Sequence, residues 1–299
     1  MKSINIISTF IFLIYGCAEN ATTSSNSYNQ TDETLNIITW NIQNFPKKNI
    51  ETINYLYEII QELDADIIAL QEIESKQDFQ ILVDNLDGWN SFVANSSSYG
   101  VNLTYLYKSE ITVIDIYEII DLDYSYLPRI PLMMEFIWNN EYVYLINNHF
   151  KCCGDGQINY QDYWDEEYRR LLSSIQIKAY IDSNLSDQNV IILGDLNDEI
   201  QDLPINNVFE PFLYDDNYMF ADINIANSNS SNWSWPGWHS TYSASHFDHI
   251  IISNELYDDF ENPLSSCETI DIEEYSILNW EEYYNFISDH KPVSIKLKI

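Results

Sequence analysis

Acidic, amide and imidazole side chains recur in this sequence at the ends of short apolar runs that are typical of buried β-strands. The clearest run is 190–193, which Gly194 ends and which Asp195 and Asn197 follow. Because side chains of an extended chain alternate between faces, Asp195 and Asn197 should point the same way. A polar turn explains any one such stretch. The pattern nevertheless occurs six times, at Asn41, Glu72, His149, Asp195 with Asn197, Asp248 with His249, and Asp289 with His290.

These residue types suit the metal-assisted hydrolysis of a phosphate ester. Glu72, Asp289 and Asn41 offer hard oxygen ligands of the kind that Mg²⁺ prefers, and Mn²⁺ or Ca²⁺ could take the same place. A bound cation polarises a phosphoryl oxygen and neutralises the charge that develops on it. An imidazole backed by a carboxylate can accept or donate a proton near neutral pH. The sequence therefore predicts a metal-dependent phosphoesterase site.

The elements that must position these residues are a mixture of strands and helices. Apolar patterns predict strands at 35–40, 66–70, 103–107, 111–120, 132–138, 142–147, 190–193, 218–223, 247–252 and 293–297. Helical spacing predicts helices at 50–63, around 79–86 and at 164–183. The longest helix should turn inward Tyr168, Leu171, Leu172, Ile175 and Ala179. Several strand pairs look like hairpins, which indicates one α/β domain whose sheets are not wholly parallel.

The charge of the chain limits its partners. Its 299 residues include 47 acidic and 13 basic side chains, which gives a net charge of -34. Such a surface repels nucleic acid and anionic membranes at low salt, and repels them less in strong salt. The charge therefore leaves three alternatives: the protein works in a saline medium, its substrate is not a long polyanion, or its acidic groups lie away from the site. Lys151, Arg169 and Arg170 lie close in sequence to His149 and form either a basic patch or a solvated helix face.

The first 34 residues are predicted to lie outside the folded domain. Residues 1–17 have the features of an export signal, with Lys2 before an apolar run that is too short to span a bilayer comfortably. The run ends in a segment similar to a bacterial lipoprotein box, with Cys17 as the lipidated residue. Plain secretion and a retained anchor are the alternatives. Residues 18–34 are rich in Asn, Ser and Thr and predict a flexible tether before a domain at 35–299.

Three cysteines remain if Cys17 carries a lipid. No spacing among them resembles a zinc site. In an oxidising compartment Cys152 or Cys153 is predicted to pair with Cys267, which would fix the loop after His149. A strained bond between the two neighbours and three reduced thiols are the alternatives.

Seven short motifs occur in the order found in one protein superfamily. They are TWNIQNF, DIIALQEIE, LPRIPLMMEF, INNHF, ILGDLND, FDHIII and SDHKPV, and they span the chain from Leu35 to Leu297. The sequence thus resembles the endonuclease/exonuclease/phosphatase superfamily, which has the deoxyribonuclease-I-like fold. The resemblance implies a four-layer sandwich, with two mixed β-sheets packed face to face, helices on the outside and the site at one rim.

The resemblance also implies how metal and phosphate are held. Asn41 and Glu72 match residues that bind the metal and the phosphate, with Glu72 as the main metal ligand. Asp289 would assist the metal or position its neighbour His290. Asn197 and Arg129 would contact the substrate phosphate, although Arg129 could instead be a surface arginine shortly before Pro131.

Further matches imply roles in proton transfer. Asp195 would orient or deprotonate the attacking water. His290 would contact the scissile phosphate or act as base, paired with Asp248. His149 matches the histidine that acts as general acid in the deoxyribonuclease and sphingomyelinase branches. Tyr105 is a weaker candidate for the site.

Together these features predict an exported, lipid-anchored, Mg²⁺-dependent phosphodiesterase that acts on nucleic acid. A lipid or inositol phosphoesterase similar to sphingomyelinase is the alternative, which the acidic charge favours. A surface binding protein with an inactive site is a third hypothesis. The aromatic segment at 232–239 could pack on the sheet rim, stack on a base or contact a lipid surface.

Overall fold

The computed structural model describes residues 34–97, 100–122, 125–237 and 243–299. All of these belong to one compact unit, Asp32–Ile299. The predicted signal peptide at 1–17 and the predicted tether, except for residue 34, lie outside the described residues.

Two six-stranded mixed sheets form the centre of the fold. The first has the order β11 (Ser266–Thr269), β12 (Val293–Leu297), β1 (Leu35–Phe45), β2 (Ile67–Ile73), β4 (Asn102–Lys108) and β3 (Trp89–Val93). The second has the order β5 (Thr112–Glu118), β6 (Leu132–Trp138), β7 (Glu141–His149), β8 (Asn189–Asp195), β10 (Asp248–Ser253) and β9 (Tyr218–Phe220). Only β1 with β2 and β7 with β8 pair in parallel among the described strands.

Side chains of the central strands point alternately to the two faces of each sheet, and this builds the layers of the fold. In β1, Leu35 and Ile37 face a core that they share with Ile191 and Leu193 of β8, so the two sheets pack face to face. Ile38 faces the opposite way, toward the helices. Strands buried on both faces therefore carry apolar residues at nearly every position, as the sequence indicated.

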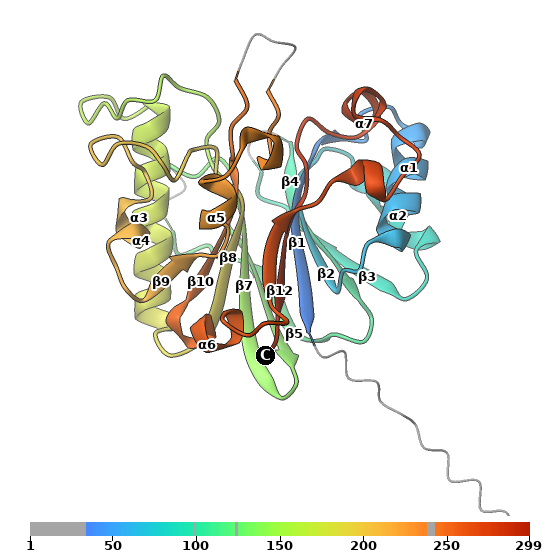
Figure 1. The fold of residues 1–299 in the computed structure, drawn as a ribbon, viewed down its shortest axis with the longest axis horizontal. Coiled ribbons are helices and arrows are strands. Elements are labelled where there is room, and N and C mark those ends of the chain that lie inside the picture. The colour runs from blue at the N-terminus through green and yellow to red at the C-terminus, as the bar shows by residue number, and fades with distance from the viewer. Residues whose placement is uncertain (1–33, 98–99, 123–124, 238–242) are drawn as a thin grey trace, which may run out of the picture. The chain divides into compact units, whose positions relative to one another are not determined.

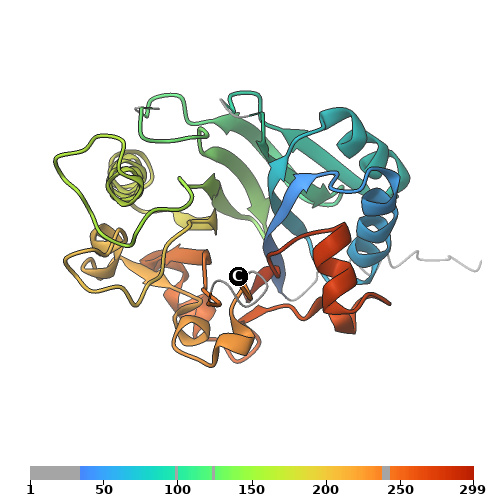
Figure 2. The same cartoon turned by 90° about the horizontal axis from the view of Figure 1, so that it is seen from above.

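Helices cover the outer face of each sheet (Figures 1 and 2). Helices α1 (Ile50–Glu62), α2 (Lys76–Asn85) and α7 (Trp280–Phe286) pack on the first sheet, and α3 (Glu166–Asn184) and α4 (Glu210–Leu213) on the second. Shorter helical turns are α5 (Ile223–Ala226), α6 (Tyr257–Phe260), η1 (Ser230–Asn232), η2 (Asn254–Leu256) and η3 (Ile272–Glu274). The predicted four-layer sandwich is confirmed.

The predicted inward face of α3 is wrong in part: Leu171 is buried and Tyr168 packs against the core, as predicted, but the rest of the face differs. Ile175 is 44% exposed and Ala179 is exposed, whereas the buried stripe runs through Glu167, Arg170 and Ser174 to Ile177 and Ile181. The stripe keeps helical spacing, but its first turns carry a buried ion pair instead of apolar side chains. Arg169 and Arg170 consequently form neither an exposed basic patch nor a solvated helix face.

The predicted bridge to Cys267 is also wrong. Cys152, Cys153 and Cys267, the three cysteines within the described ranges, are all free. Cys267 lies opposite Ile295 in the pairing of β11 with β12, and its side chain packs against the core between the sheets. Cys152 and Cys153 are exposed in the loop that follows β7. The core-facing direction of Cys267 therefore excludes the bridge in this structure.

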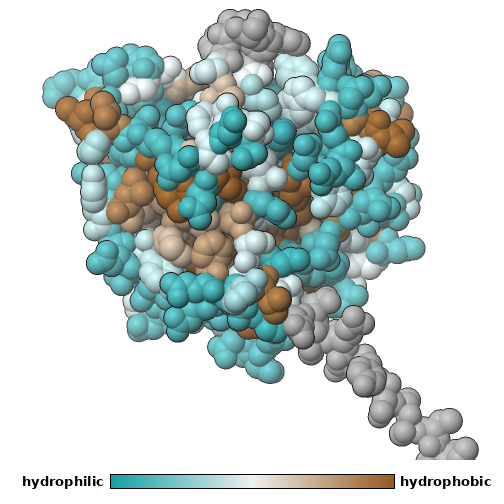
Figure 3. Space-filling model, in the orientation of Figure 1, coloured by the Kyte–Doolittle hydropathy of each residue, from teal (hydrophilic) through white to brown (hydrophobic). Residues whose placement is uncertain are grey.

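The face shown in Figure 3 is mainly hydrophilic, with hydrophobic side chains gathered in several areas across its middle and at its margins. Among the helices of the described residues, none combines the length and the apolarity needed to cross a bilayer.

Candidate active site

Strand register places three of the predicted residues in a row. In the parallel pairing of β7 with β8, His149 lies opposite Asp195, and in the antiparallel pairing of β8 with β10, Asp195 lies opposite Asp248. The three side chains thus come from neighbouring strands of the second sheet. The carboxyl ends of β7 and β8 lie at the same edge of that sheet, so the row forms one wall of a site at its rim.

A glycine permits this arrangement just before Asp195. Gly194 has a φ of 139°, a conformation that side chains rarely allow. A Cβ atom at this position would lie 2.0 Å from the carbonyl oxygen of Asn148 on the neighbouring strand. Any larger residue would therefore force β7 and β8 apart at the point where His149 and Asp195 meet.

The first sheet supplies the opposite wall. The pairing of β1 with β2 shifts register after Asn41, and the pairing of β2 with β4 shifts between Leu70 and Ile73. Such bulges redirect side chains. Glu72 lies inside the second shift and has a φ of 66°, which is strained for a residue with a side chain.

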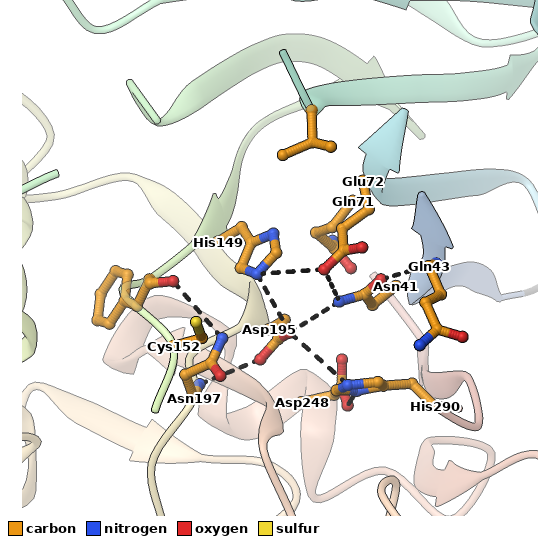
Figure 4. A network of polar contacts seen from close by, with 12 residues as sticks. Asn41, Gln43, Gln71, Glu72, His149, Cys152, Asp195, Asn197, Asp248 and His290 are labelled. Atoms are coloured by element: carbon orange, nitrogen blue, oxygen red, sulfur yellow. Dashed lines mark hydrogen bonds and ion pairs between the residues drawn. The ribbon is translucent and has the colours of Figure 1, made fainter. Parts of the chain in front are cut away.

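The two walls are joined through an asparagine (Figure 4). The side-chain amide of Asn41 donates to Glu72 Oε1 at 3.1 Å and to Asp195 Oδ2 at 2.8 Å. His149 Nε2 lies 3.8 Å from Glu72 Oε1 and 3.4 Å from Asp195 Oδ2. Asp195 Oδ1 accepts from the backbone N–H of Asn197 at 3.1 Å.

His290, just before β12, completes the network. Its Nδ1 lies 2.7 Å from Asp248 Oδ2, and its Nε2 lies 3.9 Å from Asp195 Oδ2. Asp195 is therefore the group on which Asn41, His149 and His290 converge. This arrangement can hold an anionic oxygen, orient a water and move a proton at one point.

Burial sets the protonation of the central carboxylate. It raises the pKa of the Asp195 carboxyl to about 7, although the nearby His290 opposes the shift. Burial alone would lower the pKa of the His290 ring, but the carboxylates of Asp248 and Asp195 outweigh it and raise that pKa well above its usual value. At neutral pH the site therefore holds a cationic His290 beside a carboxyl that titrates in the working range of a general base.

His149 has the opposite character. Burial lowers the pKa of its ring well below the usual value, and the charges of Arg129 and His290 lower it further. Its Nδ1 is buried and has no hydrogen-bond partner among the residues that the structure describes. The resting ring is consequently neutral at pH 7. The effect of Arg129 on this pKa also places the half-buried Arg129 side chain close to the site, where its Nε donates to the carbonyl of Val101.

A profile of the endonuclease/exonuclease/phosphatase family matches residues 38–290, a span that contains every one of these side chains. The chain belongs to this family. The resemblance drawn from its seven motifs is thereby confirmed. A search of curated protein sequences finds no match.

Solved structures of family members share the fold. D. rerio TDP2 complexed with a single-strand DNA product has a TM-score of 0.66 and 16% identity over 89% of this chain and 99% of its own. The human nocturnin catalytic domain with bound sulfate has a TM-score of 0.61 and 14% identity over 89% and 94%. A mannosyl-6-phosphatase of Bacteroides thetaiotaomicron has a TM-score of 0.59 and 14% identity over 88% and 99%. At these identities the likeness establishes the shared fold.

Oxygen donors at the rim fit the divalent cation on which enzymes of this family commonly depend. The Glu72 carboxylate is partly exposed and faces the amide of Asn41, and the Asp195 carboxylate lies across from it. In the described part of the chain, Asp248 Oδ1 is buried without a hydrogen-bond partner. Hard oxygen ligands gathered at a partly open point are what Mg²⁺ and Mn²⁺ require.

Asp289 and Lys47 occupy an adjoining part of the family site. Asp289 Oδ2 accepts from the indole N–H of Trp235 at 3.3 Å. Burial lowers the pKa of the Lys47 ammonium, while Asp289 and Glu72 both oppose that shift, so Lys47 lies near both carboxylates. Lys47 was not predicted. Its signal in the sequence is a lysine directly after the strand of Asn41, in a chain with few basic residues.

Several residues support the site from behind. The indole N–H of Trp40 donates to the Tyr283 hydroxyl at 2.8 Å, and this hydroxyl donates to the backbone carbonyl of His290 at 2.5 Å. Tyr105, a weaker candidate in the sequence, is instead buried between the sheets, and its hydroxyl lies 2.8 Å from the carbonyls of Leu132 and Leu145. Tyr105 therefore ties the sheets together and does not face the site.

A second carboxylate–imidazole cluster lies behind β10. Asp222 Oδ2 lies 3.0 Å from His246 Nε2 and 2.7 Å from His249 Nδ1, and all three residues are fully buried. His249 Nε2 lies 2.8 Å from the carbonyl oxygen of Asp198, in the loop that carries Asn197. This cluster packs against the site without forming part of it.

Proposed function

We propose that this chain is a metal-dependent phosphodiesterase that hydrolyses phosphate ester bonds in nucleic acid. One observation carries the proposal: at one rim, Asn41, Glu72 and His290, which precedes β12, come from the side of the first sheet and meet His149, Asp195 and Asp248 of the second. A binding protein with an inactive site would not require this complete set.

Asn41 and Glu72 would hold the divalent cation, with Mg²⁺ as the proposed ion and Asp289 assisting from the side of Lys47. When bound, such a cation stabilises the charge that develops on the phosphoryl oxygens. The strained conformation of Glu72 supports this assignment, because backbone strain persists where a side chain must be held in a functional position.

The remaining side chains would divide the handling of protons and phosphate. Asp195, with a pKa of about 7, would accept a proton from the attacking water. Cationic His290, held by Asp248, would bind the scissile phosphate together with Asn197 and Arg129.

His149 would protonate the leaving oxygen. Its ring is neutral in the resting site, so it must gain a proton when substrate binds. An anionic phosphate beside the ring favours this gain, because a nearby negative charge stabilises imidazolium.

Nucleic acid is the proposed substrate because the fold is shared with TDP2 in complex with a single-strand DNA product. A lipid or inositol phosphate is the second candidate, and the net charge of -34 favours it. Such a charge opposes long polyanions and opposes compact substrates less. Hydrolysis of plasmid DNA, RNA, short single strands, sphingomyelin and inositol phosphates, each compared at low and high salt, distinguishes the two.

The basic test uses bis-p-nitrophenyl phosphate with Mg²⁺, followed by EDTA. Activity that EDTA abolishes and Mg²⁺ restores supports an enzyme, and binding without turnover supports the inactive binding protein.

Glu72→Gln keeps the shape of the side chain and removes its charge. We expect a large loss of activity at low Mg²⁺ with little change in folding, since a rim carboxylate supports the ion and not the core.

We further propose that the protein is exported and carried on the cell envelope by a lipid on Cys17, on the evidence of the sequence of residues 1–17. Cys17→Ser should release the protein from the membrane fraction or block its processing. Unchanged membrane association would argue for a retained apolar anchor, and release of the unaltered protein into the medium for plain secretion.

A further inference from the structure

The loop after β7 holds two adjacent thiols against each other at the edge of the candidate site. The Cys153 thiol donates to Cys152 Sγ at 3.0 Å, and both residues are exposed. Cys152 follows His149 by three residues and appears among the residues of the site network in Figure 4. The proposed phosphodiesterase mechanism leaves this pair unused.

The two sulfurs are close to bonding distance and differ in character. A disulfide needs about 2.05 Å between sulfurs, so the present contact must shorten by only about 1 Å. Partial desolvation of its sulfur and the hydrogen bond to Cys152 raise the pKa of Cys153 to about 11, which keeps Cys153 protonated at neutral pH. The ammonium of Lys151 lies 3.7 Å from Cys152 Sγ. Cys152 is therefore the sulfur placed to attack an external disulfide.

The backbone around the pair is held by one buried arginine. Arg170 Nη1 donates to the carbonyls of Lys151 and Cys153, each at 2.7 Å. Its Nε donates to Asp198 Oδ2 at 2.7 Å. Since Asp198 directly follows Asn197, the same guanidinium holds the cysteine loop and the loop of the site that carries Asn197.

The chain beyond the pair is fixed as well. The backbone N–H of Gly156 donates to Glu167 Oε1 at 2.6 Å, and Glu167 is itself paired with Arg170. A Cβ atom at Gly154 would lie 2.1 Å from Glu167 Oε1, so the loop packs directly on this carboxylate. A disulfide between Cys152 and Cys153 would therefore form in a backbone segment that hydrogen bonds already hold on both sides.

We propose that Cys152 and Cys153 form a reversible dithiol–disulfide site that exchanges with small-molecule disulfides and fixes the loop after His149. In the first step Cys152 thiolate attacks one sulfur of the external disulfide, which forms a mixed disulfide and releases one thiol. In the second step Cys153 gives its proton to solvent and its thiolate attacks Cys152 Sγ. This forms the bond between the neighbours and expels the second external thiolate, which takes up a proton from solvent. The external disulfide gains the two electrons that the protein pair loses.

Closure of the pair changes activity more than stability. A disulfide between adjacent residues closes only a very short loop. It therefore removes little conformational entropy from the unfolded state and leaves the Tm nearly unchanged. It does restrict the peptide between two carbonyls that Arg170 holds. The closed form should have a severalfold higher kcat with little change in KM, because small errors in the position of reacting groups are costly in rate. This consequence rests on the proposed phosphodiesterase function, whereas the exchange chemistry does not.

The experiment equilibrates the full chain with reduced and oxidised glutathione at graded ratios, traps free thiols by alkylation and measures the mass of the peptide that contains residues 152–153. The expected result is a two-proton mass loss in that peptide, reversed by reductant, with Cys267 remaining a free thiol at every ratio. In the Cys153→Ser variant the reaction should stop at the mixed disulfide. The Cys267→Ala variant should form the Cys152–Cys153 disulfide at the same glutathione ratios as the unaltered chain.

Three results would overturn the proposal in whole or in part. A peptide that keeps both thiols at every ratio, or that accumulates glutathione without closing, excludes the exchange site. Closure with an unchanged kcat on bis-p-nitrophenyl phosphate excludes the effect on the loop. If the chain has no activity in either state, the proposed phosphodiesterase function fails, while the peptide masses still decide the exchange chemistry.

Discussion

Strand β10 carries two carboxylate–imidazole clusters on opposite faces. Asp248 and His249 are consecutive, so their side chains point to opposite sides of the sheet. Asp248 binds His290 at the rim, next to Asp195. His249 binds Asp222 in the layer behind, next to His246. The two groups of residues have the same chemistry and nearly the same burial, yet their partners differ.

The rear cluster is closed. His249 has an acceptor at each ring nitrogen, so both nitrogens donate and the ring is cationic. Asp222 accepts from both histidines and, through Oδ1, from the backbone N–H of Ile250. The rim cluster is open, because in the described residues His149 Nδ1 and Asp248 Oδ1 lack partners. Burial and charge are thus alike in the two clusters, and unfilled hydrogen-bonding capacity is what sets the proposed catalytic cluster apart.

The comparison predicts opposite effects for two Asp→Asn changes. Asp195→Asn should lower kcat/KM by roughly 10²–10⁴-fold, because it removes the proposed base, and leave the Tm almost unchanged. Asp222→Asn should lower the free energy of unfolding by about 3–5 kcal/mol, since it leaves a buried imidazolium without its counter-charge.

Denaturant unfolding and kinetics of both variants, measured below the unfolding transition, provide the check. If Asp222→Asn abolished activity while leaving stability intact, the assignment of the rear cluster to structure would be wrong.

The role of His149 can be distinguished from the roles of the other rim residues by changing the leaving group of the substrate. His149→Ala should lower the rate on a poor leaving group, such as an alkyl alcohol, by roughly 10²-fold or more. The loss should be much smaller with p-nitrophenol, which leaves without protonation. Rates on a matched pair of substrates measure this difference, with His249→Gln as the imidazole variant from the rear cluster. Equal losses on both leaving groups would remove the acid role from His149.

The rim cluster should also shape the pH dependence of the rate. Activity should rise with pH as Asp195 loses its proton near pH 7 and fall at higher pH when His290 loses its own. Asp248→Asn removes the carboxylate that does most to raise the pKa of His290, so the alkaline limb should move to lower pH. A kcat/KM profile of both proteins tests this, and an alkaline limb that stays in place would contradict the pairing.

The smallest expected effect concerns the stability of the rear cluster. Burial lowers the pKa of His249, but Asp222 outweighs it and raises that pKa above the unfolded value. A raised histidine pKa adds stability that is complete below the unfolded pKa, about 6.5, and is lost as pH rises through the folded pKa. The difference in unfolding free energy between the unaltered chain and His249→Gln should therefore shrink as pH increases above about 6.5. A difference that grew with pH would show that the ring is neutral.

The sequence predicted the fold and most of the rim well, for identifiable reasons. Strands such as β8 are buried on both faces, so their apolar runs are unambiguous, and the polar residue after each run marks the rim. The edge strands β3 and β11 were missed because neither contains an apolar run. Trp89–Val93 is partly buried at all positions but one, and Ser266–Thr269 alternates exposed and partly buried residues.

What the sequence did not reveal depends on contacts between distant residues. The face of α3 was predicted from apolar spacing, but the buried Arg170 takes its partners from Glu167 on its own helix and Asp198 after β8. The position of Asp195 opposite both His149 and Asp248 follows from strand register, which no local pattern encodes. The direction of Cys267 and the pairing of Asp289 with Trp235 likewise depend on tertiary packing.

The pairing of β1 with β12 places the first and last strands of the domain side by side, with Leu35 opposite Leu297. A short linker from Ile299 back to Thr34 could therefore make the backbone circular, and new ends could be opened at the Asn139–Asn140 turn between β6 and β7, away from His149. Such a circular permutant would keep every strand neighbour while presenting His149 first and Glu72 last among the rim residues. The order of the motifs along the chain thus depends on where the chain ends lie. The chemistry of the site depends only on how the two sheets pack against each other.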